Sequence, residues 1–363
     1  MQRIMKLGLV VVASIGCSMG PLAGCSSTSS GDAPPAGLVA YITNAQDNGD
    51  SPGMGTVIPV DLETGKPVNP IDVGEGAGTN AIIVTADGTT AFVSNEDTNS
   101  VTRIDLATGD VGEPITVGSE PVDIEFVPQT GEQWAWVANF GDRTITTVNL
   151  ATGEVGQTIA VPEAGPNTVA FTPDGRTCYV ANWGSDADPG STVTPIEVTD
   201  GGATGRVLTS IPVGLHPNWV AVTNDGVTAY VANKGSSSIT PIDVATSTAG
   251  AAIPVPGPPI QMEIAPDGKL AYIAIAGSEI DAVVPMDLAV TPGRVGPAIA
   301  LASKSQPHWI GFTPDGATAY VVGNGNSTLT PVTVSSGIPG TPIQVSTDPD
   351  ADILDIAILV PRQ

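Results

Sequence analysis

One sequence phrase returns seven times along this chain, at a spacing of roughly 48 residues. Its clearest copies are Val169–Gly175 (VAFTPDG) with Cys178–Asn182 (CYVAN), and Val220–Gly226 with Ala229–Asn233. A second alternating segment, such as Ser100–Gly109, and a short third one lie between copies. Apolar/polar alternation is typical of half-buried strands, and Asp-Gly and Thr-Gly pairs are typical of hairpin turns. Each repeat therefore predicts four short antiparallel strands, in keeping with 43 Gly, 33 Pro and 4% aromatic residues.

The ends of the repeat region predict that these sheets close into a ring. The first repeat begins at its second strand, Val39–Asn44, and the chain ends with an unpartnered apolar segment, Ile353–Val360. Repeats of this length could also stack as a solenoid, but the two end fragments add up to one repeat. Sealing the ring with the last strand also removes exposed sheet edges. We expect an all-β, seven-bladed β-propeller over residues 38–363, closed by the C-terminal strand joining the N-terminal blade.

The first residues have the pattern of an export signal. Arg3 and Lys6 precede an apolar stretch too short to remain in a membrane as a spanning helix. The segment Leu22–Cys25 (LAGC) resembles the lipobox of bacterial lipoproteins, which implies that Cys25 is diacylated; an ordinary secretory signal is the alternative. We expect a signal peptide over 1–24 and a flexible tether over 25–37. The protein would be exported and anchored to the cell membrane or the outer membrane, facing the extracytoplasmic space.

Charge and cysteine content exclude several classes of partner. Without Arg3 and Lys6, the chain keeps 10 of its 12 lysines and arginines and all 37 acidic residues, a formal charge of −27. Such a field disfavours nucleic acid and anionic lipid surfaces, so the only membrane contact expected is through the lipid on Cys25. Besides Cys25 only Cys178 would remain, as a small buried residue in a second strand, so no disulfide framework or CxxC site forms. We expect a monomer.

The repeat phrase resembles that of a known family of β-propeller repeats. Tyr-Val-Ala-Asn, preceded by Thr-Pro-Asp-Gly and followed by Ile-Asp-Leu-Ala-Thr-Gly, elements that are spread over the copies, resembles the YVTN β-propeller repeat over essentially all of Gly37–Gln363. The WD40 signature is absent. This resemblance implies a seven-bladed propeller of the lactonase-like superfamily and a surface or periplasmic setting. Three copies depart from the pattern, at Pro128–Gly131, Ala276–Gly277 and Gly323–Asn324, which weakens single turns only.

Residues that occur in one blade only are the candidates for function, whereas the Asn that ends the second strand in most copies is structural. Propeller ligands usually lie at the central funnel. The residue after the start of each innermost strand should point there, and it reads Asn80, Val122, Asn167, Asn218, Ile260 and His308. The only two histidines, His216 and His308, neighbour Trp219 and Trp309 at this end. They could supply a general base, a metal pair or hydrogen bonds; alternatively they satisfy rim backbone groups while the tryptophans wedge between blades.

The loops between the second and third strands supply the other candidates. Trp183, Arg143 and Lys234 are candidate ligand-binding residues. Carboxylates suited to Ca²⁺ also occur there, without EF-hand spacing, and solvated acidic loops are the alternative. These carboxylates are Asp47, Asp50, Asp186 and Asp188. No cofactor is predicted, and Ca²⁺ is the one metal ion that these loops suggest.

Two functions remain open from the sequence. The first is a non-catalytic binding or protein-interaction module of the cell envelope, with an envelope protein or a small molecule at the funnel. The second is a lactonase-type hydrolase, because Pro307–Gly316 (PHWIGFTPDG) resembles the Pro-Arg-His-x-x-Phe-x-Pro-Asp-Gly phrase of lactonase propellers. The arginine of that phrase is missing, which disfavours a phosphorylated substrate and leaves catalysis to His308 with His216. Electron transfer finds no ligand set beyond the two histidines, and no catalytic motif demands an enzyme.

Overall fold

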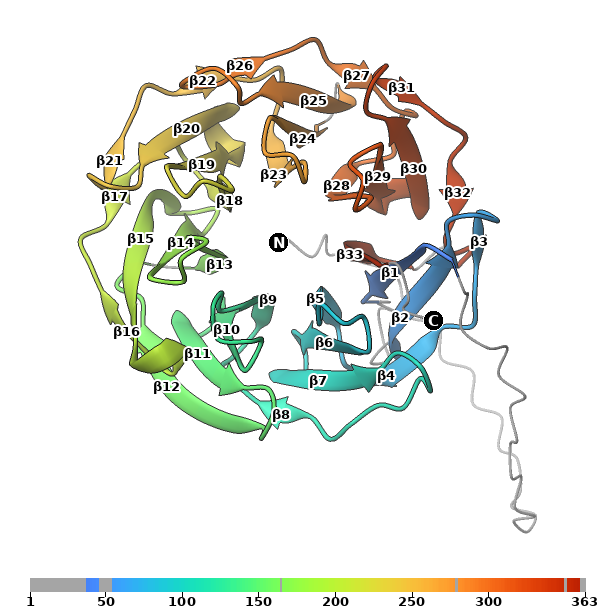
Figure 1. Ribbon diagram of the computed structural model, residues 1–363, viewed down its shortest axis with the longest axis horizontal. Coiled ribbons are helices and arrows are strands. Elements are labelled where there is room, and N and C mark those ends of the chain that lie inside the picture. The colour runs from blue at the N-terminus through green and yellow to red at the C-terminus, as the bar shows by residue number, and fades with distance from the viewer. Residues whose placement is uncertain (1–36, 46–53, 164, 278–279, 349–350, 360–363) are drawn as a thin grey trace, which may run out of the picture. The chain divides into compact units, whose positions relative to one another are not determined.

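The computed structural model describes residues 37–45, 54–163, 165–277, 280–348 and 351–359, all within one compact unit that spans residues 33–363. Seven antiparallel sheets surround a central axis (Figure 1). The segment predicted to be a signal peptide, Cys25, Asp47 and Asp50 lie outside the described residues. No helix in the described ranges is long and apolar enough to cross a membrane.

Each sheet is a blade with four strand positions, and we number the blades from the one that contains the first strand. The innermost strands, blades one to seven, are β33 (Ile353–Leu359), β5 (Thr79–Val84), β9 (Pro121–Phe126), β13 (Pro166–Phe171), β18 (Pro217–Val222), β23 (Pro259–Ile264) and β28 (Pro307–Phe312). The second strands are β1 (Val39–Asn44), β6 (Thr90–Asn95), β10 (Trp134–Asn139), β14 (Thr177–Gly184), β19 (Thr228–Asn233), β24 (Leu270–Ala276) and β29 (Thr318–Gly323). The third strands are β2 (Met54–Asp61), β7 (Ser100–Asp105), β11 (Thr144–Asn149), β15 (Pro189–Thr199), β20 (Ser238–Asp243), β25 (Asp281–Asp287) and β30 (Thr328–Thr333).

The outer position is one strand in two blades and two short pieces in the others. The single strands are β8 (Ile115–Thr116) and β12 (Glu154–Ala160). The paired pieces are β3 (Lys66–Pro67) with β4 (Ile71–Glu75), β16 (Thr204–Val207) with β17 (Ile211–Pro212), β21 (Thr248–Ala249) with β22 (Ile253–Pro254), β26 (Arg294–Val295) with β27 (Ile299–Ala300), and β31 (Ile338–Pro339) with β32 (Ile343–Gln344). The helical segments in the described ranges are the 3-10 turns η1 (Asp200–Gly202), η2 (Lys234–Ser236) and η3 (Asn324–Asn326).

The C-terminal strand closes the ring, as expected. β33 pairs antiparallel with β1, with Ile356 opposite Ile42, so the two ends of the fold share one sheet. Figure 1 shows the red C-terminal strand beside the blue N-terminal one. Asp355 in β33 then reaches the next blade, where its carboxylate accepts a hydrogen bond from the Ile82 N–H at 2.9 Å. The prediction of an all-β, seven-bladed propeller is confirmed.

The asparagine that ends the second strand holds the blade together. The Asn182 amide is fully buried and donates to the hydroxyls of Thr192 and Thr194 on the third strand, at 2.9 and 2.8 Å. Asn95, Asn139 and Asn233 make the same pair of contacts in their blades. The structural role predicted for this asparagine is confirmed.

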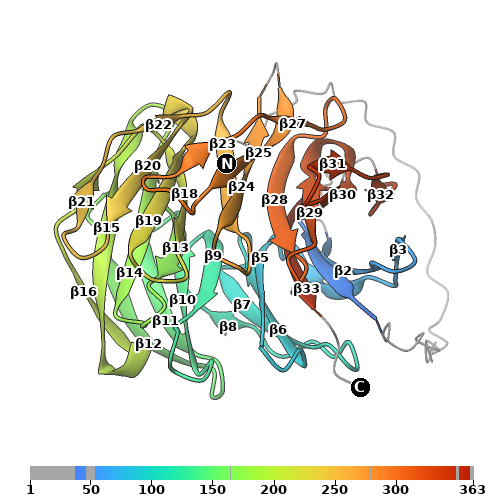
Figure 2. The ribbon, with the colours of Figure 1, turned by 45° about the horizontal axis from the view of Figure 1, so that its top comes forward.

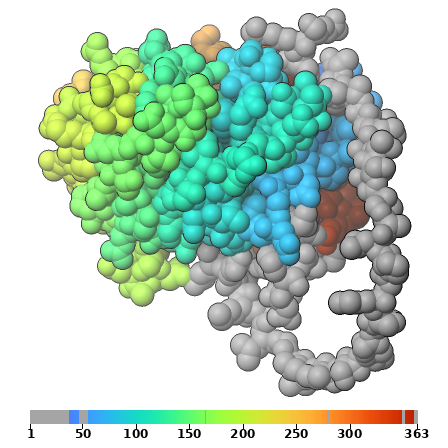
Figure 3. Space-filling model, turned by 90° about the horizontal axis from the view of Figure 1, so that it is seen from below, coloured from blue at the N-terminus to red at the C-terminus, as the bar shows by residue number. Residues whose placement is uncertain are grey.

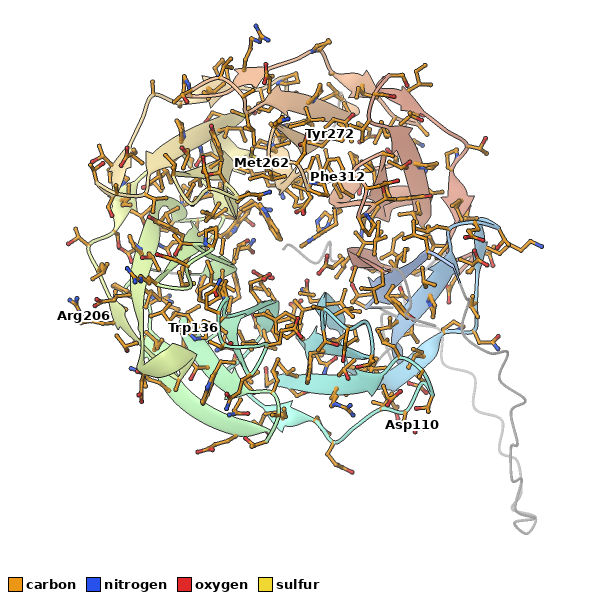
Figure 4. All side chains as sticks on the ribbon, viewed as in Figure 1. Asp110, Trp136, Arg206, Met262, Tyr272 and Phe312 are labelled. Atoms are coloured by element: carbon orange, nitrogen blue, oxygen red, sulfur yellow. The ribbon has the colours of Figure 1, made fainter. Side chains whose placement is uncertain are left out.

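The core lies between neighbouring blades. Trp136 is fully buried, meets Phe171 of the next blade edge-to-face at 5.3 Å, and donates its indole N–H to the Gly202 carbonyl. Cys178 is a free thiol buried in the same cluster, as expected. Figure 4 shows Trp136 within the ring of blades and Arg206 at its outer edge. The strands run through the thickness of the ring (Figure 2), and the cyan and green blades pack into a continuous outer surface (Figure 3).

Candidate functional site

The candidate site lies at what we call the mouth, the end of the ring where the innermost strands begin and the second strands end. Two sets of equivalent positions surround it. The residue after the repeated asparagine position, where the second strand ends in most blades, donates its N–H to the carbonyl of the residue just before the innermost strand of the same blade. These hydrogen bonds are Glu96 to Gly78, Phe140 to Glu120, Trp183 to Gly165, Lys234 to His216 and Asn324 to Gln306. The repeat thus fixes the backbone and leaves the side chain free to vary from blade to blade.

The position before the innermost strand has a left-handed backbone. Gly78 and Gly165 occupy it in two blades, with φ of 58° and 66°. Glu120, His216 and Gln306 adopt the same conformation, with φ of 53°, 48° and 46°. Side chains other than glycine are strained in this region of backbone space, and such strain gathers at functional sites. Glycine would therefore adopt the backbone conformation of His216 with less strain.

Three of the predicted residues come together at this mouth. The rings of Trp183 and His216 lie 4.3 Å apart between centroids, and the Lys234 ammonium lies 4.9 Å from the centre of the Trp183 ring. His216 Nδ1 is also 3.2 Å from the Trp183 carbonyl oxygen. All three side chains are half-buried. We call Trp183, His216 and Lys234 the mouth cluster; it joins the fourth and fifth blades.

The charge of Lys234 is partly desolvated. Burial lowers the pKa of its ammonium, and the carboxylate of Asp186 opposes this shift. No carboxylate of the described residues lies within ion-pair distance of the ammonium. A half-buried cation over an aromatic ring can attract an anionic group of a ligand.

His308 faces the same charge from the seventh blade. Burial, and next the positive charge of Lys234, lower the pKa of the His308 imidazole to about 3, so the ring is neutral in ordinary buffers. Its Nδ1 atom is buried and finds no hydrogen-bond partner among the described residues. The ring lies 4.5 Å from that of Trp309. A neutral imidazole with a free nitrogen can accept a proton.

The two tryptophans behind the histidines contact each other. Trp219 and Trp309 meet edge-to-face at 5.6 Å, although they belong to the fifth and seventh blades. Each also packs between adjacent blades, Trp309 between the seventh and the first and Trp219 between the fifth and the sixth, as the alternative reading expected.

The amides of Asn167 and Asn218 make hydrogen bonds within the scaffold. Both are buried, and their amides donate to the backbone carbonyls of Asn218 and Ile260 in the next blade. In both innermost strands the pairing with the second strand shifts register between the first and the third residue, as at a β-bulge. The side chain of the second residue, the asparagine, therefore turns toward the neighbouring blade. These two residues are scaffold.

Asn80 differs from the other two asparagines. Its Nδ2 donates to the Glu96 carboxylate at 3.0 Å, and its Oδ1 is buried without a donor among the described residues. Burial raises the pKa of Glu96, and the charges of Asp97 and Glu120 raise it further. The mouth is thus acidic beside the second and third blades.

The remaining candidates lie on exposed loops, and the charge of Asp186 acts on Lys234 of the mouth cluster. Arg143 is exposed on the β10–β11 loop. Asp186 and Asp188 are exposed on the β14–β15 loop. Across the described ranges, no three His, Cys, Asp or Glu side chains are grouped to hold a metal ion.

Four carboxylates on innermost strands were missed by the sequence reasoning. Asp123 and Glu125 come from the third blade, Glu263 from the sixth and Asp355 from the first. Burial, with the charges of Glu125 and Asp355, raises the pKa of Glu263 to about 8, whereas the Glu125 side chain is exposed. Burial also raises the pKa of Asp355 to about 7 and that of Asp123 well above its usual range. Aligning the innermost strands by position shows Glu125 and Glu263 where the other blades carry small or apolar residues.

Comparison with known proteins supports the fold. No protein family model and no curated protein matches the sequence. A candidate 6-phosphogluconolactonase of Bacteroides fragilis has a TM-score of 0.70 at 17% identity, over 89% of this chain and 98% of its own. A periplasmic gluconolactonase of Pseudomonas aeruginosa has a TM-score of 0.68 at 16% identity, over 87% and 99%. Hydrazine synthase of Kuenenia stuttgartiensis has a TM-score of 0.62 at 22% identity, over 71% and 77%.

These comparisons decide the architecture. The chain is a seven-bladed propeller similar to 6-phosphogluconolactonase-like structures. At such identities the likeness concerns the fold, and function has to be argued from the mouth.

Proposed function

We propose that this chain is an exported, lipid-anchored propeller that acts as a binding module of the cell envelope and holds an anionic group of its ligand at the mouth cluster. The observation that carries the proposal is the contact of Lys234 with Trp183 beside His216. Equivalent positions in other blades carry Glu96, Phe140 and Asn324 on the same backbone, so the scaffold does not require this cluster.

The sequence context supports an extracytoplasmic role. The lipobox-like segment ending at Cys25 would tether the propeller to a membrane, and the YVTN resemblance fits a surface or periplasmic protein. One structural neighbour is periplasmic. The formal charge of −27 after removal of the export signal disfavours nucleic acid as a partner. We expect the chain to act as a monomer. The ligand would be a small molecule or an exposed group of an envelope protein.

The test is a thermal-melt panel on the purified chain with sugar acids, sugar lactones, amino acids and Ca²⁺, with lactone hydrolysis followed in parallel. A ligand that binds only the folded state raises the melting temperature. We expect at least one anionic compound to do so without turnover. A panel in which no anionic compound changes the melt would overturn the proposal.

Lactone hydrolysis is the second candidate, favoured by neutral His308 facing the charge of Lys234. In this scheme the imidazole accepts a proton from water as the water oxygen attacks the lactone carbonyl. Lys234 stabilises the oxyanion, the ring C–O bond breaks, and the imidazolium returns the proton to the leaving alkoxide. An imidazole with a pKa of about 3 is a weak base, which ranks this function second. Turnover that disappears in His308→Gln would support it.

A further inference from the structure

The repeat places charges of opposite sign at equivalent positions of the mouth. Glu96 and Lys234 both follow a second strand and make the same backbone hydrogen bond, in the second and fifth blades. Glu120 and His216 share the left-handed position before the innermost strand, in the third and fifth blades. The second and fifth blades lie three apart in a ring of seven, which is as far apart as two blades can be (Figure 1). The mouth is therefore bipolar.

The acidic side carries an unsatisfied group. Asn80 is 1% exposed, and its Oδ1 lacks a donor among the described residues while its Nδ2 is bonded to Glu96. A buried acceptor without a donor is costly, and it often marks a place for a water or a bound group. Glu96 beside it has Asp97 and Glu120 as electrostatic neighbours and no basic side chain of the described residues among them. A donor with positive charge fits both Asn80 and Glu96.

An organic cation suits this side better than a metal ion, since no metal-binding group of three side chains occurs in the described ranges. An ammonium supplies three N–H donors. The opposite side offers the Lys234 ammonium over Trp183, which suits a carboxylate.

We propose that the ligand is a small zwitterion of the amino-acid and short-peptide class. Its ammonium would lie against Glu96 and Asn80, and its carboxylate against Lys234. The inference rests on the proposed function, because it uses the mouth cluster for the anionic end. An extended peptide spans at most about 3.6 Å per residue, so the length of the best ligand reports the separation of the two charges.

The test is isothermal titration of the full chain with glycine and with di-, tri- and tetraglycine. The best binder is then compared with its N-acetylated and its C-amidated forms. We expect each modification to weaken binding roughly tenfold or more, because a charge-assisted hydrogen bond is lost. Equal affinity for the modified and the free peptides, or no peptide binding, overturns the inference.

Two variants test which charged residue of the mouth binds each end of the peptide. Glu96→Gln keeps an acceptor for Asn80 and removes the charge, so N-acetylation should then change the affinity less than about twofold, while C-amidation keeps its effect. Lys234→Asn should show the reverse pattern. Glu154→Gln and Lys269→Met, both exposed away from the mouth, should behave as wild type. Loss of selectivity at both ends in every variant counts against the assignment.

The binding function and the zwitterion inference can be overturned independently of each other. If a sugar acid binds the wild type, is lost in Lys234→Asn, and no peptide binds, the zwitterion inference is wrong and the binding function stands. If no anionic compound of any kind binds, both are wrong.

Discussion

Asn182 illustrates how a single amide ties two strands of a blade together. Because its side chain is fully buried and bonds two threonine hydroxyls, Asn182→Ala removes one donor from each hydroxyl and opens a cavity. We expect a loss of about 1–3 kcal/mol in the free energy of unfolding, measured by chemical denaturation. Asn224→Ala, at an exposed turn with one hydrogen bond, is the matched control and should cost less than about 0.5 kcal/mol. Equal losses in both would contradict the structural role.

At the residue scale, repetition separates what the sequence could predict from what it could not. The role of Asn182 follows from its recurrence, and Lys234 and Trp183 stand out because other blades lack them. The hydrogen bond of the Asn167 amide to the next blade could not be predicted, since it depends on a register shift in its strand. A residue count carries no information about such a shift.

At the scale of the element, the C-terminal strand β33 closes the ring. Four-stranded blades and the pairing of β33 with β1 follow from alternation and from the incomplete first repeat. The inward acids, such as Glu263, were overlooked because alternation alone does not say which side of an innermost strand faces the axis.

The closing strand gives a second prediction. Ile356 in β33 is 8% exposed and packs with Ile42 and Val322. Replacing it by alanine should lower the unfolding free energy by about 2–4 kcal/mol, because a buried side chain is lost and a cavity remains. The control is Ile338→Ala on the outer strand β31, where the side chain is 63% exposed and a change below about 0.5 kcal/mol is expected. A neutral Ile356→Ala would mean that β33 does not complete the core.

At the scale of the whole molecule, the acids around the axis make stability depend on pH. Glu263 and Asp355 have folded pKa values of about 8 and 7, against about 4 in the unfolded chain. Because these pKa values are raised, the protonated acids stabilise the folded state. This stabilisation is complete below about pH 4 and is lost as the pH rises through 7 to 8. His308 acts oppositely, because its pKa of about 3 costs stability only as pH falls below about 6.5.

The third prediction follows from this balance. Between about pH 6 and pH 8.5 the melting temperature should fall, because the acids around the axis lose protons that the folded state holds. Glu263→Gln should reduce the fall, whereas Glu113→Gln, exposed on the outside, should leave it unchanged. A melting temperature that is constant or rises across this window would refute the coupling.

The central claim is that the mouth cluster binds the ligand while the repeat only supplies its backbone. The fold provides its own control, because the turn at Lys234–Ser236 and the turn at Asn324–Asn326 have the same backbone, with left-handed Ser237 and Ser327 after them. Lys234→Asn therefore places the residue of the seventh blade in the fifth without changing the turn.

The most direct measurement is the ligand-induced shift in melting temperature of Lys234→Asn beside wild type and Lys269→Met, using the anionic compound that stabilises the wild type most. The unliganded melts should coincide within about 1 °C, and the shift should survive in Lys269→Met and vanish in Lys234→Asn. A shift of wild-type size in Lys234→Asn would show that the ligand binds elsewhere.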